Sequence, residues 1–426
     1  MKESIKKRIE AVRRGEVPEG YVSKNHQLRP ADWKYEKIGK YLVPYDEFSN
    51  DTEAYPLATS SRQGLMLQSE YYSDQRYEET TGGFHVVPVG YVTYRHMSDD
   101  DIFRFNVNKM GQPVLVSPEY PVFTTTGELD QELLVAYLNG MKEFQAFCSA
   151  QKKGSTRTRM YFHRLGEFTI PIPSITEQQK IAEILKACDR MIELKQRKID
   201  ELNKLKQVCL LEMFPQKGQT IPQRRFPGFS APWEQRKLGD IADIVGGGTP
   251  STGNPSYWDG DIDWYAPAEI ADQIYANSSQ KKITNLGYEN SSAKMLPPGT
   301  VLFTSRAGIG KTAILTRKGC TNQGFQSIVP HRGALDSYFI FSRTGELKRY
   351  GELVGAGSTF VEVSGKQMAA MELMMPPTMR EQQTIGGFFQ QLDHLITLHQ
   401  RELAEVGKYK KALMQLLLTG LVRVNA

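Results

Sequence analysis

The chain has 426 residues, well above the size of one typical domain, so more than one folding unit is expected. Hydrophobic residues make up 40% and charged residues 24%, which is ordinary for globular proteins and excludes wholesale disorder. The net charge of +5 permits a nucleic-acid partner but does not require one, because binding depends on how cations cluster. Four widely spaced cysteines without a Cys-x-x-Cys pair argue against a zinc ribbon or a disulfide framework.

Neither end of the chain carries a pattern typical of membrane targeting. The first residues are basic and lack the apolar core of a signal peptide. The apolar stretch at residues 413–422 is too short to span a bilayer. A cytoplasmic protein without a membrane partner is therefore expected.

The first half of the chain begins with a predicted basic amphipathic helix over residues 1–15, with Ile5, Ile9 and Val12 on one face. β-Strands are predicted within residues 85–94, where a Pro-Gly turn occurs, and at 168–170. The first globular part should therefore mix α and β structure.

A long helix is predicted next, with Thr176 as its N-cap and Glu177 in its first turn. No proline or glycine follows up to Phe214, a length of about 57 Å at 1.5 Å per residue. A Pro-rich linker follows at residues 219–232. The second globular part has predicted strands at 299–304 and 313–316. A second long helix closes the chain. The expected divisions are a lead-in at 1–24, a first domain at 25–174, a long helix at 175–218, a linker and second domain at 219–376, and a long helix at 377–426.

Both long helices carry apolar residues at alternating spacings of three and four, which is the pattern of a helix–helix seam. The two seams superpose at an offset of 204 residues, and we expect the helices to pack on each other. The alternative is two unrelated amphipathic helices, each on its own domain. The seam positions are Leu185, Cys188, Ile192, Ile199, Leu202, Cys209, Phe389, Leu392, Ile396, Leu403, Val406, Leu413 and Leu417.

Four short matches in the same order indicate a tandem duplication. A Trp-x-x-x-Lys-[Ile/Leu]-Gly frame starts at Trp33 and again at Trp233. A Pro-x-Gly strand start occurs at 88–94 and again at 297–303. Gly-Ser-Thr at 154–156 recurs at 357–359, and Glu-Gln-Gln at 177–179 recurs at 381–383.

Two motifs suggest catalysis but do not fit it. Residues 307–312 resemble a nucleotide P-loop, yet Ser305 stands where a glycine is required, and a strand rather than a helix is predicted to follow. Asn254-Pro255-Ser256-Tyr257 resembles the tetrapeptide of amino-methyltransferases, but its third residue is serine and no Gly-rich cofactor loop precedes it. The histidines show no metal-ligand spacing, so neither catalytic residues nor a metal site are predicted.

What remains is a set of cations and small polar residues suited to phosphate oxygens. The densest group lies at residues 151–159, and its counterpart at 355–359 keeps only the small residues. A solvated surface loop is the alternative interpretation. The candidate DNA-binding residues are Lys152, Lys153, Ser155, Thr156, Arg157, Arg159, Arg62, Arg95, His96, Lys281, Lys282, Arg306, Lys311, Ser358 and Thr359.

These features together resemble the DNA-specificity subunit of Type I restriction-modification enzymes. The resemblance rests on the duplication, the Thr249–Trp264 segment, the Ser305–Lys311 run and the two Pro-x-x-x-Glu-Gln-Gln-x-Ile helix entries at 173–181 and 377–385. It covers nearly the whole chain. The first domain lacks the Thr-Pro-Ser…Tyr-Trp segment of the second, as expected if each reads a different half-site.

The resemblance implies an α+β fold, with two target-recognition domains separated by two long antiparallel coiled-coil helices and related by a pseudo-twofold repeat. It implies a subunit without a catalytic site that reads a bipartite, asymmetric duplex DNA sequence. The implied partners are two methyltransferase subunits and restriction/translocase subunits, which would hold S-adenosylmethionine, ATP and Mg, with no cofactor in this chain. The alternative function is a coiled-coil adaptor that does not bind DNA.

Overall fold

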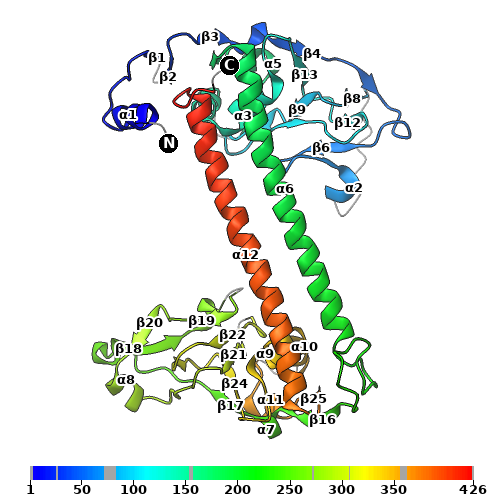
Figure 1. Cartoon of the computed structure of the whole chain (residues 1–426), viewed down its shortest axis with the longest axis vertical. Coiled ribbons are helices and arrows are strands. Elements are labelled where there is room, and N and C mark those ends of the chain that lie inside the picture. The colour runs from blue at the N-terminus through cyan, green and yellow to red at the C-terminus, as the bar shows by residue number, and fades with distance from the viewer. Residues whose placement is uncertain are drawn as a thin grey trace. The chain divides into compact units, whose positions relative to one another are not determined.

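The computed structural model describes residues 3–24, 27–71, 83–152, 157–270, 273–306, 308–355 and 362–424 (Figure 1). The chain divides into two compact units. Unit 1 comprises residues 1–195 and 402–426, and unit 2 comprises residues 196–401. Each unit therefore contains parts of both long helices. Among the described residues, no helix combines the length and apolar character needed to cross a membrane.

Unit 1 mixes short antiparallel strands with helices, as the sequence predicts. A four-stranded sheet has the order β11-β9-β13-β4, and a three-stranded sheet has the order β12-β8-β5. The strands of these sheets are β4 (Leu42–Pro44), β5 (Phe48–Ser49), β8 (Phe84–Val87), β9 (Val92–Tyr94), β11 (Phe105–Val107), β12 (Val114–Val116) and β13 (Val122–Thr125). Two-stranded pairs join β1 (Tyr21–Lys24) to β2 (Gln27–Pro30), β6 (Ala58–Ser60) to β7 (Leu65–Leu67), and β10 (Met97–Ser98) to β14 (Thr158–Arg159). Its shorter helices are α1 (Glu3–Arg13), α2 (Gln68–Tyr71), α3 (Gln131–Gly140), α4 (Lys142–Ala150) and α5 (Phe162–Leu165).

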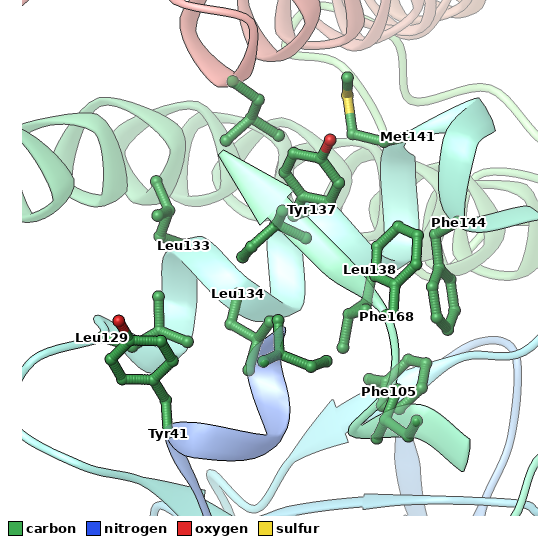
Figure 2. Packing of buried hydrophobic residues seen from close by; sticks show 14 of the residues in the cluster. Tyr41, Phe105, Leu129, Leu133, Leu134, Tyr137, Leu138, Met141, Phe144 and Phe168 are labelled. Atoms are coloured by element: carbon green, nitrogen blue, oxygen red, sulfur yellow. The ribbon is translucent and has the colours of Figure 1, made fainter. Parts of the chain in front are cut away.

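The core of unit 1 lies between the helices α3 and α4 and the four-stranded sheet (Figure 2). Phe105 from the sheet meets Phe144 of α4 edge to face at 5.5 Å, and Phe168 meets the same ring at 5.0 Å. All three rings are at most 4% exposed. Edge-to-face contact of this kind adds stability beyond the burial of area.

Unit 2 has a five-stranded sheet of order β17-β24-β21-β22-β19 and a three-stranded sheet of order β20-β18-β23. The strands are β17 (Ala242–Gly246), β18 (Trp258–Tyr265), β19 (Tyr275–Ala276), β20 (Lys281–Ile283), β21 (Val301–Phe303), β22 (Thr312–Leu315), β23 (Cys320–Thr321) and β24 (Gln326–Pro330). The shorter helices are α7 (Leu238–Ile241), α8 (Asn285–Glu289), α9 (Ser337–Ser342), α10 (Thr344–Gly355) and α11 (Gly365–Ala369). Because β22 begins at Thr312, the run that resembles a P-loop leads into a strand, as predicted.

Each unit pairs the strand after the tryptophan of its repeated frame with its last strand, which places the sequence repeat in the fold. In unit 1, β3 (Lys34–Lys37) pairs antiparallel with β15 (Thr169–Ile172). In unit 2, β16 (Glu234–Lys237) pairs antiparallel with β25 (Glu372–Met375). β3 begins directly after Trp33, and β16 begins directly after Trp233.

The Glu-Gln-Gln repeats anchor these tryptophans. Trp33 donates its indole N–H to Glu177 and Trp233 donates to Glu381, both at 3.1 Å. Arg423 binds Glu177 through two nitrogens, and Arg225 binds Glu381 likewise. The repeated glutamate is thus a buried acceptor that ties each long helix to the start of its unit.

The long helices are α6 (Ile175–Glu212) and α12 (Met379–Leu418). The predicted N-cap Thr176 is wrong, because the helix begins one residue earlier and Ser174 Oγ accepts the N–H of Glu177 at 3.3 Å. Ile175 lies between Ser174 and Thr176 and is the first residue of the helix, since it has no side-chain oxygen that could cap a backbone N–H. Thr378 caps α12 in the same way.

Within each unit the two long helices pack antiparallel. In unit 1, Lys195 lies 2.5 Å from Glu402, and Lys410 pairs with Asp189. In unit 2, Lys206 lies 2.6 Å from Asp393, beside a cluster of Leu202, Leu392 and Ile396. Lys195, Lys206 and Lys410 occupy seam positions between the apolar ones, and these ion pairs explain why lysines are tolerated there. Every predicted seam residue is buried or half-buried.

Candidate nucleic-acid interface

The cations predicted in unit 1 gather around one loop, residues 98–102. The pairing of β10 with β14 sets Met97 opposite Arg159 and Ser98 opposite Thr158. The same loop receives Lys152 from the end of α4 and Arg62 from the turn between β6 and β7. Residues that are far apart in the sequence therefore form one cationic surface.

Three consecutive aspartates of this loop each hold a different candidate cation. Asp99 accepts from Arg157 Nε at 2.8 Å, and Asp100 accepts from Arg62 at 2.5 Å. Asp101 lies 3.8 Å from Lys152 Nζ. Nothing in the sequence spacing indicated these pairs, because each aspartate lies between 38 and 58 residues from its partner.

A cavity of about 470 Å³ opens beside the loop, and three arginines line it, Arg62, Arg95 and Arg104. Hydroxyl and amide side chains of Ser61 and Gln63 share the lining. Among the described residues, Arg95 and Arg159 are exposed and have no carboxylate partner. Exposed guanidinium groups beside hydroxyls are suited to phosphate oxygens.

His96 is placed differently from the other candidates. It is 8% exposed, and its Nδ1 has no hydrogen-bond partner in the part of the chain that the structure describes. Desolvation by burial lowers the pKa of its imidazole, with the nearby Glu119 opposing this shift. The ring stacks on the half-exposed Tyr161 at 6.0 Å. A buried, neutral histidine of this kind supports the packing and is a poor phosphate ligand.

The candidates of unit 2 do not gather in one place. Arg306 faces Glu362 at 3.9 Å, and the backbone N–H of Lys311 donates to Thr304. Lys281 lies over the ring of Trp258, with Nζ 5.9 Å from its centre. The first two flank the turn between β21 and β22, and Lys281 lies on β20.

Lys282 belongs to a network around the buried Asp263, and Arg317, which was not predicted, shares it. Arg317 Nε lies 2.6 Å from one carboxylate oxygen and Lys282 Nζ lies 3.8 Å from the other. Ser279 donates to Asp263 through its backbone N–H and its hydroxyl. The basic pair Arg317–Lys318 after β22 was the available sequence signal for this site.

Five predicted residues lie outside the described residues, namely Lys153, Ser155, Thr156, Ser358 and Thr359. Among the residues that are described, no group of three histidine, cysteine or acidic side chains is placed to hold a metal ion. Burial raises the pKa of Cys148 to about 12 and that of Cys320 to about 11, so these thiols are poor nucleophiles at neutral pH.

The chain belongs to the Methylase_S family, the Type I restriction modification DNA specificity domain. The family matches residues 105–204 and 231–408, which is more than half of the chain and falls in both units. The predicted family resemblance is therefore confirmed, together with its repeated α+β architecture.

Several specificity subunits are similar in sequence. The MjaIX subunit of Methanocaldococcus jannaschii is 36% identical over 167 residues, which is 38% of each chain. The putative MjaX subunit of the same organism is 26% identical over 70% of this chain and 69% of its own. The EcoR124I/EcoR124II subunit of Escherichia coli is 26% identical over 38% of this chain and 41% of its own. The match thus covers well under half of the length of the MjaIX subunit.

Two solved structures share the fold. The S subunit of a Type I restriction-modification system from M. genitalium aligns with a TM-score of 0.57 over 95% of this chain and 98% of its own, at 14% identity. A chain from a study of complex assembly and conformational transition of the type I R-M system aligns with a TM-score of 0.53, over 92% and 99% of the two chains, at 17% identity.

Proposed function

We propose that this chain is the DNA-reading subunit of a Type I restriction-modification complex, without catalytic activity of its own. The observation that carries the proposal is the duplicated specificity domain, which supplies two similar units on one pair of helices. The two units present different cations, since unit 1 gathers them around residues 98–102 and unit 2 divides them between two places. Two different readers on one chain fit a bipartite, asymmetric duplex target in the cytoplasm.

The partners we propose are two methyltransferase subunits, together with restriction/translocase subunits. Among the exposed apolar residues on the helix pair, three in each unit have an exposed apolar counterpart in the other unit, and these are 42–66% exposed. We call them the apolar sets. The set of unit 1 is Met191, Leu194 and Tyr409, and the set of unit 2 is Leu395, Leu398 and Leu205.

The two apolar sets occupy equivalent positions, because each member of one has its counterpart at an offset of 204 residues. The ion pair of Asp189 with Lys410 in unit 1 sets the turns of Met191 and Tyr409 side by side. Exposed apolar residues repeated in this way favour two copies of one partner. In this proposal S-adenosylmethionine, ATP and Mg reside on those partners, and this chain holds no cofactor.

The first prediction tests DNA binding by the full chain with its methyltransferase partners. Affinity for a duplex should fall steeply as salt rises, because neutralised phosphates release counterions. Replacing Arg95 and Arg159 by alanine should flatten the log–log salt slope by about two units, roughly one per lost contact. Titration of a fluorescent duplex at several KCl concentrations measures the slope.

The matched control replaces two exposed lysines of unit 1 that lie outside the cationic surface, Lys34 and Lys142. This variant should keep the wild-type slope. A complex that shows no salt-dependent duplex binding would favour the alternative, a coiled-coil adaptor that does not bind DNA.

A further inference from the structure

We propose that Asp99, Asp100 and Asp101, which we call the acidic loop, compete with DNA phosphates and suppress the binding of unit 1 to duplexes of arbitrary sequence. The inference rests on the proposed function, since it assigns a selective role to residues beside the DNA-binding cations. It concerns three carboxylates that the sequence did not single out.

The geometry of the ion pairs is the first argument. Arg62 comes from the turn between β6 and β7, while Lys152 and Arg157 come from the segment between α4 and β14, and each cation pairs with its own member of the acidic loop. Of the six cations that the structure describes at this surface, half are thereby neutralised, and Arg95, Arg104 and Arg159 remain. A duplex that approaches meets carboxylates where it would otherwise meet free guanidinium and ammonium groups.

The acidic loop is held in place by its own hydrogen bonds. Asp100 accepts from the Ser98 hydroxyl at 2.9 Å and from the backbone N–H of Ile102 at 3.3 Å. The Thr158 hydroxyl donates to Asp101, whose φ of 62° lies in the left-handed region. Non-glycine residues adopt this region rarely, so the surrounding structure fixes the loop in this form.

The solvent exposure of each ion pair decides whether a DNA phosphate can replace the aspartate in it. Two of the ion pairs are exposed, and we call them the outer pairs. In the pair of Arg62 with Asp100 the side chains are 63% and 44% exposed. In the pair of Arg157 with Asp99 they are 52% and 68% exposed. Exposed ion pairs contribute little to stability, so a phosphate can replace the carboxylate at small cost. Asp101 is only 19% exposed and also binds Thr158, which makes it the fixed end of the loop. A duplex of arbitrary sequence therefore leaves the outer ion pairs intact. A target duplex also makes base contacts, and their binding energy allows its phosphates to replace the two carboxylates.

The test replaces Asp99 and Asp100 by asparagine in the full chain with its methyltransferase partners. Asparagine keeps the shape and the hydrogen-bond acceptor but removes the charge. Affinity for an arbitrary duplex should rise about tenfold, and the salt slope should steepen by about two units as Arg62 and Arg157 gain phosphates. Adding Arg62→Ala and Arg157→Ala should return the slope to that of the wild type.

The matched control removes two other exposed carboxylates of unit 1 that pair with cations, Glu16→Gln and Glu167→Gln. It makes the same change in net charge away from the loop. Equal affinity and slope in the control and acidic-loop variants would overturn the inference while leaving the proposed function intact. A wild-type complex that binds no duplex would overturn both.

Discussion

Asp263 is a carboxylate with 2% of its surface exposed that organises the basic residues of one end of unit 2. Desolvation by burial opposes its ionised form, but hydrogen bonds from Ser279 and Arg317 outweigh that effect and hold the pKa below its usual value of 3.8. Lys282 was predicted as a candidate from a pair of lysines. Asp263 and Arg317 were not, because residues 54 positions apart meet only in the folded strand pairing.

We predict that Asp263→Asn destabilises unit 2 by about 1–3 kcal/mol at pH 7, since Arg317 and Lys282 lose a charged acceptor. A carboxyl group with a lowered pKa stabilises the fold above its unfolded pKa, and that contribution disappears as the pH falls through the folded pKa. The difference between variant and wild type should therefore shrink below a pH of about 3.8. Urea unfolding at pH 7 and pH 3 measures it.

The control for this prediction is Asp261→Asn, which alters an exposed carboxylate on the same strand. Its unfolding should match the wild type at both pH values. An Asp263→Asn defect of equal size at pH 7 and pH 3 would show that the loss comes from packing and not from the charge.

At the scale of elements, the repeats were predictable but the contacts between them were not. The Trp-x-x-x-Lys-[Ile/Leu]-Gly frame and the Glu-Gln-Gln helix entry were recognised as separate repeated motifs. Trp233 and Glu381 meet in the structure, and so do their counterparts in unit 1. Arg225 lies in the Pro-rich linker and Arg423 near the C-terminus, at different distances from the helix ends, so the repeat offset could not reveal them.

We predict that Glu381→Ala destabilises the protein by about 3–5 kcal/mol, because it leaves the largely buried Arg225 without its carboxylate partner and the buried Trp233 indole without its acceptor. Glu177→Ala should cost less, since Arg423 is 31% exposed and Arg225 only 11%. Glu381→Gln should fall between alanine and wild type. Calorimetric unfolding ranks the variants.

Glu405→Ala is the control for this series, because Glu405 is an exposed carboxylate on the same long helix. It should unfold like the wild type. If Glu177→Ala proves as damaging as Glu381→Ala or more so, burial of the arginine does not set the cost.

At the scale of the whole molecule, the duplication has a consequence for stoichiometry. The alternation of apolar residues predicted that the helices pack on each other, and their ion pairs show that they do so antiparallel within each unit. The same offset of 204 residues relates the two apolar sets. The heptad spacing correctly left these residues out of the seam, but it could not show that they stay exposed instead of packing against the rest of their unit.

We predict that each apolar set binds one methyltransferase subunit, so that the two can be removed independently. Met191→Lys with Leu194→Lys should reduce the complex from two partner subunits to one. Leu395→Lys with Leu398→Lys should do the same, and the fourfold variant should bind none, because a lysine cannot be buried in an apolar interface without a partner charge. Native mass spectrometry counts the bound subunits directly.

Gln196→Lys with Gln400→Lys is the matched control, since these exposed glutamines occupy equivalent positions of the two helices outside both sets. It should retain two partners. If either double lysine variant still binds two subunits, or loses both at once, the two sets are not independent docking positions.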